Sequence, residues 1–587
     1  MSRSGLAWLA VSPFIVIAPG ILKGGGFQGE ELQTAHCEIG RRGGRLAVSL
    51  RAEPNTLNPL IALDAPSREA IGRMNGDLIA INRQTQRTEP GLAKSWALSK
   101  DGRTFVLRLR RGIRFSDGEP FDADDVLFTF AVYLDEKIHS PQRDLLMVAG
   151  KPVAVRKIDS HTVEFQLAAP YSAAERMFDS VAILPRHLLE AAYRDGTLAR
   201  AWTLNTPPEK IAGLGPFRLK EYRPGERLTL ERNPYYWKVD TAGSRLPYLN
   251  ELVFLFAGSE DAQVLRFSAG ETDIVDRLSA ANFAMLSRDA PAKGLRLEDL
   301  GPGLEYSFLF FNLRPAAGEK YPEIARKQRW FASAGFRQAV SAAIDRDAIV
   351  RLVYQGRAKA IWGNVSPGNK LWYDEKLPRP PMSVERARRL LASAGFSWNA
   401  AGDLLGQDGG RVEFSILTSS SNAERTRMAA LIQDDLKRIG IRVTIAALEF
   451  RTLIGRVMNS YEYESALLAL GNGDADPNAE MNVWMSNGPT HLWNPGEERP
   501  ATGWEAEIDG LMEEQIATLD YQKRKRLYDR VQEIAAAELP LICLAGPDVL
   551  VAARRSIGNL RAAVLAPYTL WNADELYLKD AAAGRSK

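Results

Sequence analysis

The sequence contains few of the residues that build disulfide frameworks or metal clusters. Among its 587 residues are two cysteines and five histidines. Two cysteines exclude a disulfide-dense scaffold and a zinc cluster made of cysteines. No two histidines have the H-x-x-x-H spacing of the common helical zinc motif. Cys543 lies in the apolar run Leu541–Leu544, where a buried and unreactive thiol is expected.

Sequence motifs of catalysis and nucleotide binding are also missing. We find no G-x-S-x-G nucleophile elbow and no G-x-x-x-x-G-K-[ST] phosphate-binding loop. Residues 24–29 match G-x-G-x-x-G, but they follow no predicted strand and open no helix, so we interpret them as linker. The sequence therefore predicts a protein that is not an enzyme, with no catalytic residue, no metal and no cofactor.

The charge balance is nearly neutral. The chain has 75 Lys and Arg against 72 Asp and Glu, a net charge of +3. A dedicated nucleic-acid binder concentrates positive charge, so no nucleic-acid partner is expected. The hydrophobic share of 45% and the charged share of 25% are typical of a soluble globular protein. At about 150 residues per domain, the length allows about four domains or fewer large ones.

The N-terminal region contains the one long apolar stretch of the chain, Gly5–Leu22, which Arg3 precedes. A basic start and an apolar stretch are typical of an export signal. Because the stretch is about as long as a bilayer is thick, an uncleaved membrane anchor is the alternative. Cys37 resembles a lipidation site, but His36 stands where a small residue is needed. We predict an export signal or anchor and a flexible spacer over 1–43, and a periplasmic or extracytoplasmic location.

Hydrophobic patterning predicts alternating helices and strands. Thr104–Leu109 alternates as a strand does, and Asp122 with Asp125 forms a capping-box pattern for a helix through Leu134. In the second half we expect helices over 336–344, 384–393, 423–438 and 522–537, with strands over 441–445 and 541–544. This succession indicates an α/β fold. We interpret the basic run Lys523–Arg526 as a solvated helix face.

Several sequence blocks, in their order along the chain, resemble the family 5 extracellular solute-binding proteins, the oligopeptide-, dipeptide- and nickel-binding receptors of bacterial ABC importers. The resemblance spans about 44 to 580. The blocks that carry it are Ala93–Trp96, Asp101–Phe105, Leu107–Arg110, Phe115–Phe121, Ala123–Val126, Leu184–Leu189, Glu231–Trp237, Leu246–Leu249, Ala269–Ile274 and Arg337–Val340.

The resemblance implies a bilobal periplasmic-binding-protein-like α/β fold. Three domains would place a ligand cleft between two lobes that close around the ligand. Lobe I would comprise 44–83, 206–305 and 541–587, with domain II inserted over 84–205. Lobe II, the third domain, would comprise 306–540.

The same resemblance implies a receptor that captures a peptide or similar small solute. As a monomer, it would deliver this ligand to the transmembrane subunits of an ABC permease. The alternative is a membrane-anchored ligand-sensing subunit that signals through a partner. Peptides, opines, sugars and metal chelates all remain open as ligands, because a fold alone does not decide function.

A ligand-binding loop is implied around Asp474 and Asp476. Peptide receptors of this family often have Asp-x-x-Asp-Pro, in which the first aspartate pairs with the α-amino group of the ligand. Here the spacing is one residue shorter, and Asp474 is the best match for that role. A fixed carboxylate suits a desolvated ammonium group. The alternative is that both aspartates shape a turn.

The remaining candidate ligand contacts come from strand edges and aromatic residues. Peptide receptors of the family bind the ligand backbone as an added strand, and the matching edges here lie near Ala65 and Gly471. The aromatic candidates are Trp362, Phe450, Trp484 and Trp493. For Phe450, Trp484 and Trp493, packing in the protein core is the alternative to ligand contact, whereas Trp362 lies in a loop that in this family often faces the cleft.

Overall fold

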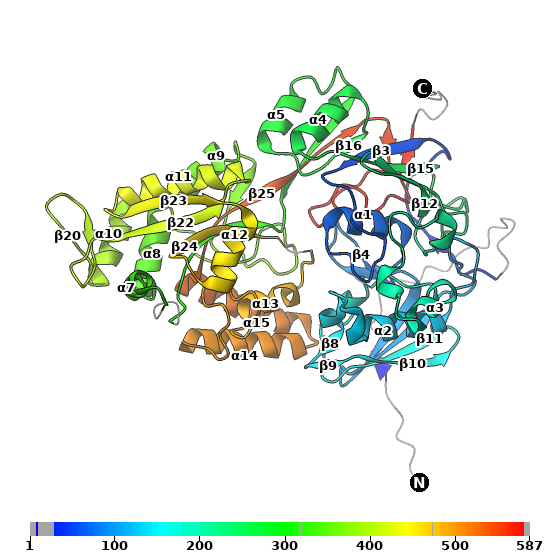
Figure 1. Cartoon of the computed structure of the whole chain (residues 1–587), viewed down its shortest axis with the longest axis horizontal. Helices are drawn as coiled ribbons and strands as arrows, with labels where there is room; N and C mark the ends of the chain where they lie inside the picture. Colours follow the sequence, from blue (N-terminus) through cyan, green and yellow to red (C-terminus); the bar gives the residue numbers. More distant parts are fainter. Residues whose placement is uncertain (1–7, 10–28, 180, 316–319, 472, 580–587) are drawn as a thin grey trace, which may run out of the picture. The chain divides into compact units, whose positions relative to one another are not determined.

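The computed structural model describes residues 8–9, 29–179, 181–315, 320–471 and 473–579. The chain divides into two compact units (Figure 1). Unit 1 comprises Met1–Leu278, Asn282–Glu298 and Val551–Lys587, and unit 2 comprises Ser279–Ala281 and Asp299–Leu550. The predicted three-domain division stays a prediction.

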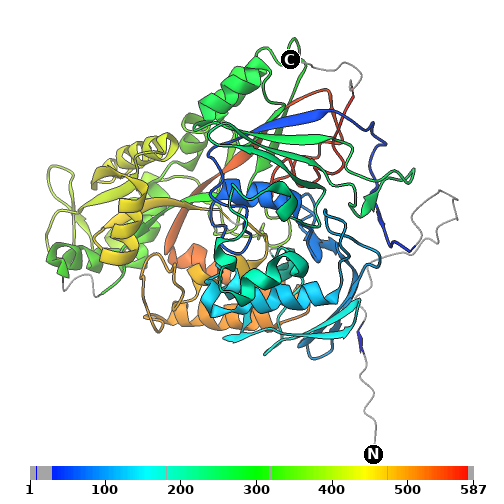
Figure 2. The ribbon, with the colours of Figure 1, turned by 45° about the vertical axis from the view of Figure 1, so that its right-hand side comes forward.

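Unit 1 contains a mixed sheet in the order β12-β13-β15-β3-β16. Strand β3, from the start of the chain, is parallel to β15, and Figure 2 shows the dark blue and green strands side by side. The strands are β3 (Arg45–Leu50), β12 (Phe217–Arg223), β13 (Arg227–Arg232), β15 (Glu251–Phe256) and β16 (Ile274–Val275). The helices nearby in sequence are α1 (Ala65–Met74), α4 (Glu260–Ala269) and α5 (Ala280–Ser287).

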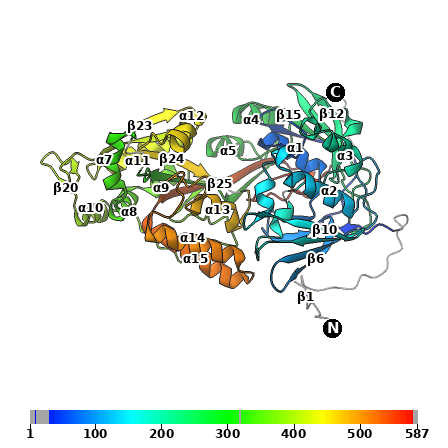
Figure 3. The same ribbon diagram turned by 60° about the horizontal axis from the view of Figure 1, so that its bottom comes forward.

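A second, antiparallel sheet of unit 1 has the order β1-β6-β7-β11-β10. Helix α2 packs against β10 and β11 (Figure 3). The predicted capping box is confirmed, because Asp122 and Asp125 exchange side-chain and backbone hydrogen bonds. The elements are β1 (Trp8–Leu9), β6 (Ala93–Ser99), β7 (Thr104–Leu109), β10 (Ala154–Asp159), β11 (Thr162–Gln166), α2 (Ala123–Leu134) and α3 (Arg186–Arg194).

The predicted flexible spacer is wrong for residues 29–43, which belong to unit 1. Strand β2 (Gln33–Thr34) pairs in parallel with β14 (Lys238–Val239). Glu31 accepts from the Lys94 ammonium at 2.6 Å. The partners lie far away in sequence, so local composition carried no sign of them. The predicted export signal lies outside the described residues except for Trp8–Leu9.

Unit 2 is built on a mixed sheet in the order β25-β18-β24-β22-β23. Strand β22 is parallel to both β23 and β24, whereas β18 is antiparallel to β24 and β25. The strands are β18 (Tyr306–Phe311), β22 (Glu413–Ser419), β23 (Arg442–Leu448), β24 (Ser465–Leu470) and β25 (Leu541–Arg554), while β17 (Leu295–Pro302) and β19 (Ala358–Ala360) also pair with β25.

Helices cover this sheet, and α14 and α15 lie side by side (Figure 3). Their bounds are α7 (Pro322–Phe331), α8 (Ala334–Ala343), α9 (Arg346–Leu352), α10 (Val384–Ser393), α11 (Ala423–Lys437), α12 (Phe450–Gly455), α13 (Met481–Trp484), α14 (Gly503–Ala517) and α15 (Tyr521–Glu538). Among the described residues, no helix combines the length and apolar character needed to cross a bilayer.

The core of unit 2 has two parts because successive residues of a strand point to opposite faces. In β18, Leu309 and Phe311 belong to one apolar cluster, and Phe308 and Phe310 belong to the other. Cys543 is buried in the second cluster, as expected, and burial raises the pKa of its thiol to about 12. The sheet therefore separates two independent cores.

Strand β25 is longer than the predicted strand 541–544, and the crossing from unit 2 to unit 1 falls within it. Its first part pairs with β18 and β19 in unit 2, and its last part pairs with β16 in unit 1. Asp548 lies in this strand, and burial together with nearby Asp299 raises the pKa of its carboxyl group to about 6.

The Asp548 carboxyl should make stability depend on pH. A folded-state pKa above the unfolded value of about 3.9 means that the folded state binds the proton more tightly. Stability is therefore lost as pH rises from about 4 to about 6. Asp548→Asn removes this loss, so its melting temperature should exceed that of the wild type at pH 7.5 and approach it at pH 4.5. Thermal unfolding monitored by circular dichroism measures the melting temperature of each protein at each pH.

The exposed carboxylate of Glu498 provides the control, because Glu498→Gln should leave the pH dependence of the melting temperature unchanged. A melting-temperature difference for Asp548→Asn that is equal at both pH values contradicts the prediction.

Candidate functional site

Three parallel strands of unit 2 end at the same edge of the sheet. Strands β23, β22 and β24 run in one direction, and their last residues are Leu448, Ser419 and Leu470 (Figure 1). In open α/β sheets, ligands bind outside the carboxyl ends of the strands. The segments that follow these strands therefore form the candidate site.

Three of the predicted ligand-binding residues lie in these segments. Gly471 is exposed and Asp474 is half-buried, and both follow β24. Phe450, the first residue of α12, follows β23 and is 50% exposed. The Asp474 carboxylate accepts the Ala475 N–H at 2.6 Å. The structure thus brings Asp474, Gly471 and Phe450 to one edge of the sheet.

The end of β24 offers a free side for backbone pairing. On its β18 side, pairing continues as far as Leu470. On its β22 side, the register covers Ser465 and Ala466. Within the described part of the chain, no strand pairs with Ala469 or Leu470 on that second side. An extended ligand could therefore add to β24 there.

Asp476 holds the loop through buried contacts. Its side chain is buried, and its two oxygens accept from the Arg524 guanidinium at 2.7 and 2.6 Å. It also accepts the Asn478 N–H at 3.0 Å, which caps the short helix η7 (Pro477–Glu480). A bidentate pair fixes both position and orientation. Burial and pairing support the alternative for Asp476, a structural carboxylate, and its ligand contact stays a prediction.

Further buried hydrogen bonds hold the same loop. The Asn369 amide donates to the Ala475 carbonyl at 2.8 Å. Glu480 accepts from the Tyr306 hydroxyl at 3.2 Å and from the Trp484 indole at 2.8 Å. Burial and the neighbouring Glu480 raise the pKa of Tyr306 well above its usual value. These contacts fix the segment that carries Asp474 to the core of unit 2.

Trp484 and Trp493 are core residues. Both side chains are at most 1% exposed and belong to the second apolar cluster. The Trp493 indole donates to Glu505 at 2.9 Å, which satisfies its N–H without a ligand. The rings lie 5.5 Å apart. The prediction that these indoles contact the ligand is not supported, because their surfaces are already covered by the protein.

Trp362 is half-buried in the loop after β19. Its indole donates to the Pro380 carbonyl at 3.2 Å, and the Arg346 guanidinium lies 5.6 Å from its ring centre. These contacts hold one side of the ring, and the ligand contact stays a prediction.

In unit 1, Ala65 lies on the wall of a pocket of about 230 Å³. The expected strand edge at this point is wrong, because Asp64 caps helix α1 and accepts the Ser67 N–H at 2.8 Å. The pocket also contains Glu69 and Asp276, and burial raises the pKa of both carboxyl groups. Ala65 is therefore exposed at the start of a helix instead of on a strand.

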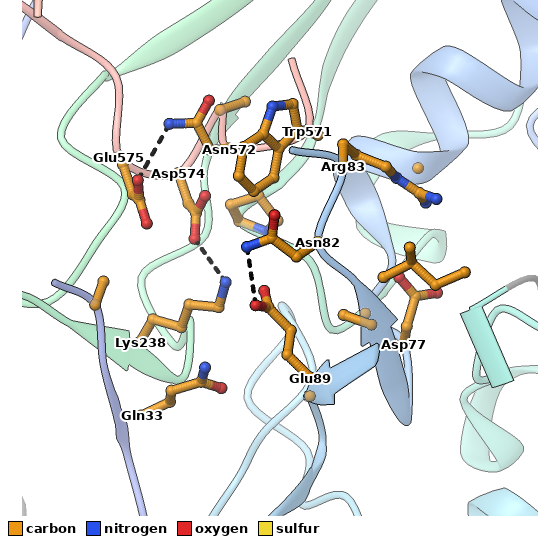
Figure 4. A pocket seen from close by; sticks show the side chains of 18 of the residues that line it. Gln33, Asp77, Asn82, Arg83, Glu89, Lys238, Trp571, Asn572, Asp574 and Glu575 are labelled. Carbon is orange, nitrogen blue, oxygen red and sulfur yellow. Dashed lines mark hydrogen bonds and ion pairs between the residues drawn. The ribbon is translucent and has the colours of Figure 1, made fainter. Parts of the chain in front are cut away.

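A second pocket of unit 1 has a volume of about 280 Å³ and a charged lining (Figure 4). Lys238 pairs with Asp574 at 3.1 Å, and the Asn82 amide donates to Glu89 at 3.1 Å. Burial and nearby Asp179 raise the pKa of Asp77 well above its usual value. None of the predicted ligand-binding residues lines this pocket.

Sequence reasoning missed Arg524 and Asn369, which position the loop. Arg524 lies within the basic run that was expected to be solvated, yet it is buried. The helical period of 3.6 provides a signal, because Arg524 shares a face with Tyr528, Val531 and Ala535, all of them buried. Asn369 carries no such signal.

Comparisons with known proteins agree with this architecture. Residues 87–491 match the family described as bacterial extracellular solute-binding proteins, family 5 Middle. A probable ABC transporter-binding protein of Deinococcus radiodurans is 28% identical over 517 residues, which cover 84% of this chain and 85% of the relative. A periplasmic alpha-galactoside-binding protein of Rhizobium meliloti is 28% identical over 494 residues, 79% of this chain and 70% of the relative.

Solved structures show the same fold. The oligopeptide-binding protein AppA of Bacillus subtilis, in complex with a nonapeptide, superposes with a TM-score of 0.68 at 23% identity. The superposition covers 92% of this chain and 100% of that chain. The α/β fold of the periplasmic binding proteins, expected from the sequence, is thereby confirmed.

The Asp476–Arg524 pair gives a direct prediction for stability. Arg524→Ala leaves a buried carboxylate without its cation and should lower the free energy of unfolding by about 3–5 kcal/mol. Urea unfolding measures this change. Replacing both members with apolar residues, Asp476→Leu with Arg524→Met, should recover most of the loss, because no buried charge then remains.

Lys523→Ala is the matched control in the same helix turn. Lys523 pairs with Glu514 at 3.0 Å, and both side chains are more than half exposed. Loss of such a surface pair should change the free energy of unfolding by less than about 1 kcal/mol. If Arg524→Ala costs no more than Lys523→Ala, the loop does not depend on the buried pair.

Proposed function

Because the chain belongs to the family 5 bacterial extracellular solute-binding proteins, which are receptors and not enzymes, we propose that the solute it captures for an ABC transporter is a short peptide. The observation that supports a peptide is the end of β24, where a free strand side and the carboxylate of Asp474 occur together. An extended peptide with a free amino group matches both features.

The free side of β24 suits the backbone of a peptide. Peptide N–H and C=O groups that join a sheet as an added strand receive partners independently of their side chains. Gly471 follows the strand directly and is exposed, so no side chain at this position blocks an approaching backbone. Such a receptor binds peptides of varied sequence.

Asp474 supplies the counter-charge for the peptide α-amino group. Of the two aspartates in the loop, Asp476 has both oxygens engaged by Arg524. Asp474 is half-buried, so water screens its charge less than it would at the surface. Because the loop is fixed by buried hydrogen bonds, the carboxylate is positioned before the ligand arrives, which lowers the entropic cost of binding.

Three further residues are proposed as ligand contacts. Phe450 offers an apolar surface at the same edge of the sheet, where it can pack against a peptide side chain. Trp362 is retained because part of its ring is exposed. In unit 1, Ala65 is retained because it lines a pocket.

We propose that the protein is an exported periplasmic monomer that passes its ligand to the transmembrane subunits of the permease. Family membership supports an extracytoplasmic location. Transport families contain receptors for different solutes: the Rhizobium relative is named for α-galactosides and the Bacillus structure holds a nonapeptide. The experiment below therefore includes a sugar.

Asp474→Ala should lower the affinity for trialanine by about 10- to 100-fold, because a hydrogen bond to a charged group contributes about 1.5–3 kcal/mol. Isothermal titration calorimetry with the wild type and the variant measures this. N-acetyl-trialanine has no ammonium group, so the two proteins should bind it equally, and Glu498→Gln should bind trialanine as the wild type does.

Two outcomes of this titration overturn separate parts of the proposal. Equal affinity of the wild type and Asp474→Ala for trialanine removes Asp474 from the ammonium role. Binding of raffinose, an α-galactoside, without binding of any peptide leaves a solute receptor but removes the peptide.

A further inference from the structure

A buried cluster of one histidine and two glutamates lies in unit 2. The side chains of His491, Glu497 and Glu505 are 0%, 6% and 4% exposed, respectively. His491 Nε2 lies 3.2 Å from Glu497 Oε2 and 3.7 Å from Glu505 Oε1. One nitrogen and two carboxylate oxygens thus converge in a region shielded from bulk solvent.

The hydrogen bonds around the cluster orient its donor atoms inward. His491 Nδ1 lies 3.0 Å from the Val483 carbonyl, which accepts a hydrogen bond from that nitrogen. In a neutral imidazole this leaves the lone pair on Nε2, facing the two carboxylates. Thr502 donates to Glu505 Oε2 at 2.8 Å, and Trp493 donates to Oε1 at 2.9 Å.

Two buried atoms of the cluster make no well-aligned hydrogen bond. Among the residues that the structure describes, this holds for His491 Nε2 and for Glu497 Oε2, although the two atoms are 3.2 Å apart. The Glu497 oxygen is therefore not in line with the N–H bond that a protonated His491 Nε2 would have. A buried polar atom without a hydrogen-bond partner carries a substantial desolvation cost. Two such atoms that lie side by side but do not bond to each other therefore suggest that an ion binds between them.

The charges of the cluster also favour a divalent cation. With a neutral imidazole, two buried carboxylates carry two negative charges, and buried charges need compensation. Arg337 attracts Glu505 electrostatically, but its guanidinium donates to the carbonyls of Phe331 at 2.7 Å and Glu538 at 2.7 Å. A divalent ion neutralises the two carboxylates completely, whereas a proton on His491 leaves one negative charge.

The distances fit a small transition-metal ion. All three donor atoms lie within 4.8 Å of one another. Ligands about 2.0–2.1 Å from a tetrahedral zinc ion are about 3.4 Å apart, and the observed separations of 3.2 and 3.7 Å bracket that value. Imidazole nitrogen and carboxylate oxygen are both zinc ligands.

We propose that His491 Nε2, Glu497 Oε2 and Glu505 Oε1 bind one Zn²⁺ ion, with water in the fourth position. Glu505 lies in the first turn of α14, and His491 and Glu497 lie in the loop that precedes this helix. The ion therefore closes the loop from residue 491 to residue 505 onto the start of α14. It has a structural role and is independent of the solute that the protein captures.

Zinc binding to the full-length protein tests the proposal. After removal of metals with a chelator and dialysis, titration with zinc chloride should show one tightly bound ion per chain by elemental mass spectrometry. The melting temperature should rise by several degrees, because the ion binds the folded state alone. No retained zinc and an unchanged melting temperature would falsify the site and leave an imidazolium between two carboxylates.

Two variants separate this site from other histidine–carboxylate pairs. Glu497→Gln preserves shape but removes a ligand, and it should weaken zinc binding by more than about 100-fold, since changes in outer-shell partners alone cost about 10- to 100-fold. His187→Gln is the matched control, because His187 pairs with a single carboxylate, Asp117, at 2.7 Å in unit 1. It should bind zinc as the wild type does.

The wild type alone keeps the proposal testable if Glu497→Gln does not fold. X-ray absorption of the zinc-loaded protein should show an imidazole nitrogen and oxygen ligands at about 2.0–2.1 Å and no sulfur at about 2.3 Å. A sulfur ligand would assign the ion to Cys37 or Cys543 and overturn the site, as would zinc affinity in Glu497→Gln equal to that of the wild type.

Discussion

The geometry of the candidate site depends on one buried ion pair, Asp476–Arg524. Taking two charges out of water is costly, and the pair is favourable only because its geometry is bidentate and its remaining donors are satisfied. Arg524 meets this condition, because its Nε also donates to the Gln515 carbonyl at 3.1 Å and to the Gln515 side-chain oxygen at 2.8 Å. The pair ties the loop after β24 to helix α15, and this loop carries Asp474. A carboxylate proposed to bind the ligand is thus positioned by a second carboxylate that is held by an arginine.

Elsewhere in unit 2, buried residues that form the scaffold are likewise distinct from the exposed residues of the candidate site. Because side chains alternate along β18 and β24, the sheet has one apolar cluster on each face. The cluster that contains Trp484 and Trp493 lies beneath the loop, and its polar atoms are bonded to Glu480 and Glu505. Aromatic residues in an Asn-, Gly- and Pro-rich segment are therefore scaffold. The exposed positions of the candidate site are Gly471 and Phe450.

Local signals in the sequence predicted local structure well. The capping box at Asp122 and the strand Thr104–Leu109 are both confirmed, since each depends on neighbouring residues in the chain. Features that depend on distant partners were not predictable. Residues 29–43 were expected to be a spacer because their partner strand β14 lies some two hundred residues away. Arg524 was misinterpreted because its partner is in another element, and the two tryptophans were ambiguous because burial is decided by tertiary packing.

The discontinuity of unit 1 has a consequence for biosynthesis. Its central strand β3 is among the first elements made, yet β16, which pairs with β3, is also paired by the last part of β25. The ribosome must therefore complete all of unit 2 before the residues from Val551 onward can join unit 1. Pairings between such distant segments form late. Unit 1 thus stays incomplete until synthesis is nearly finished.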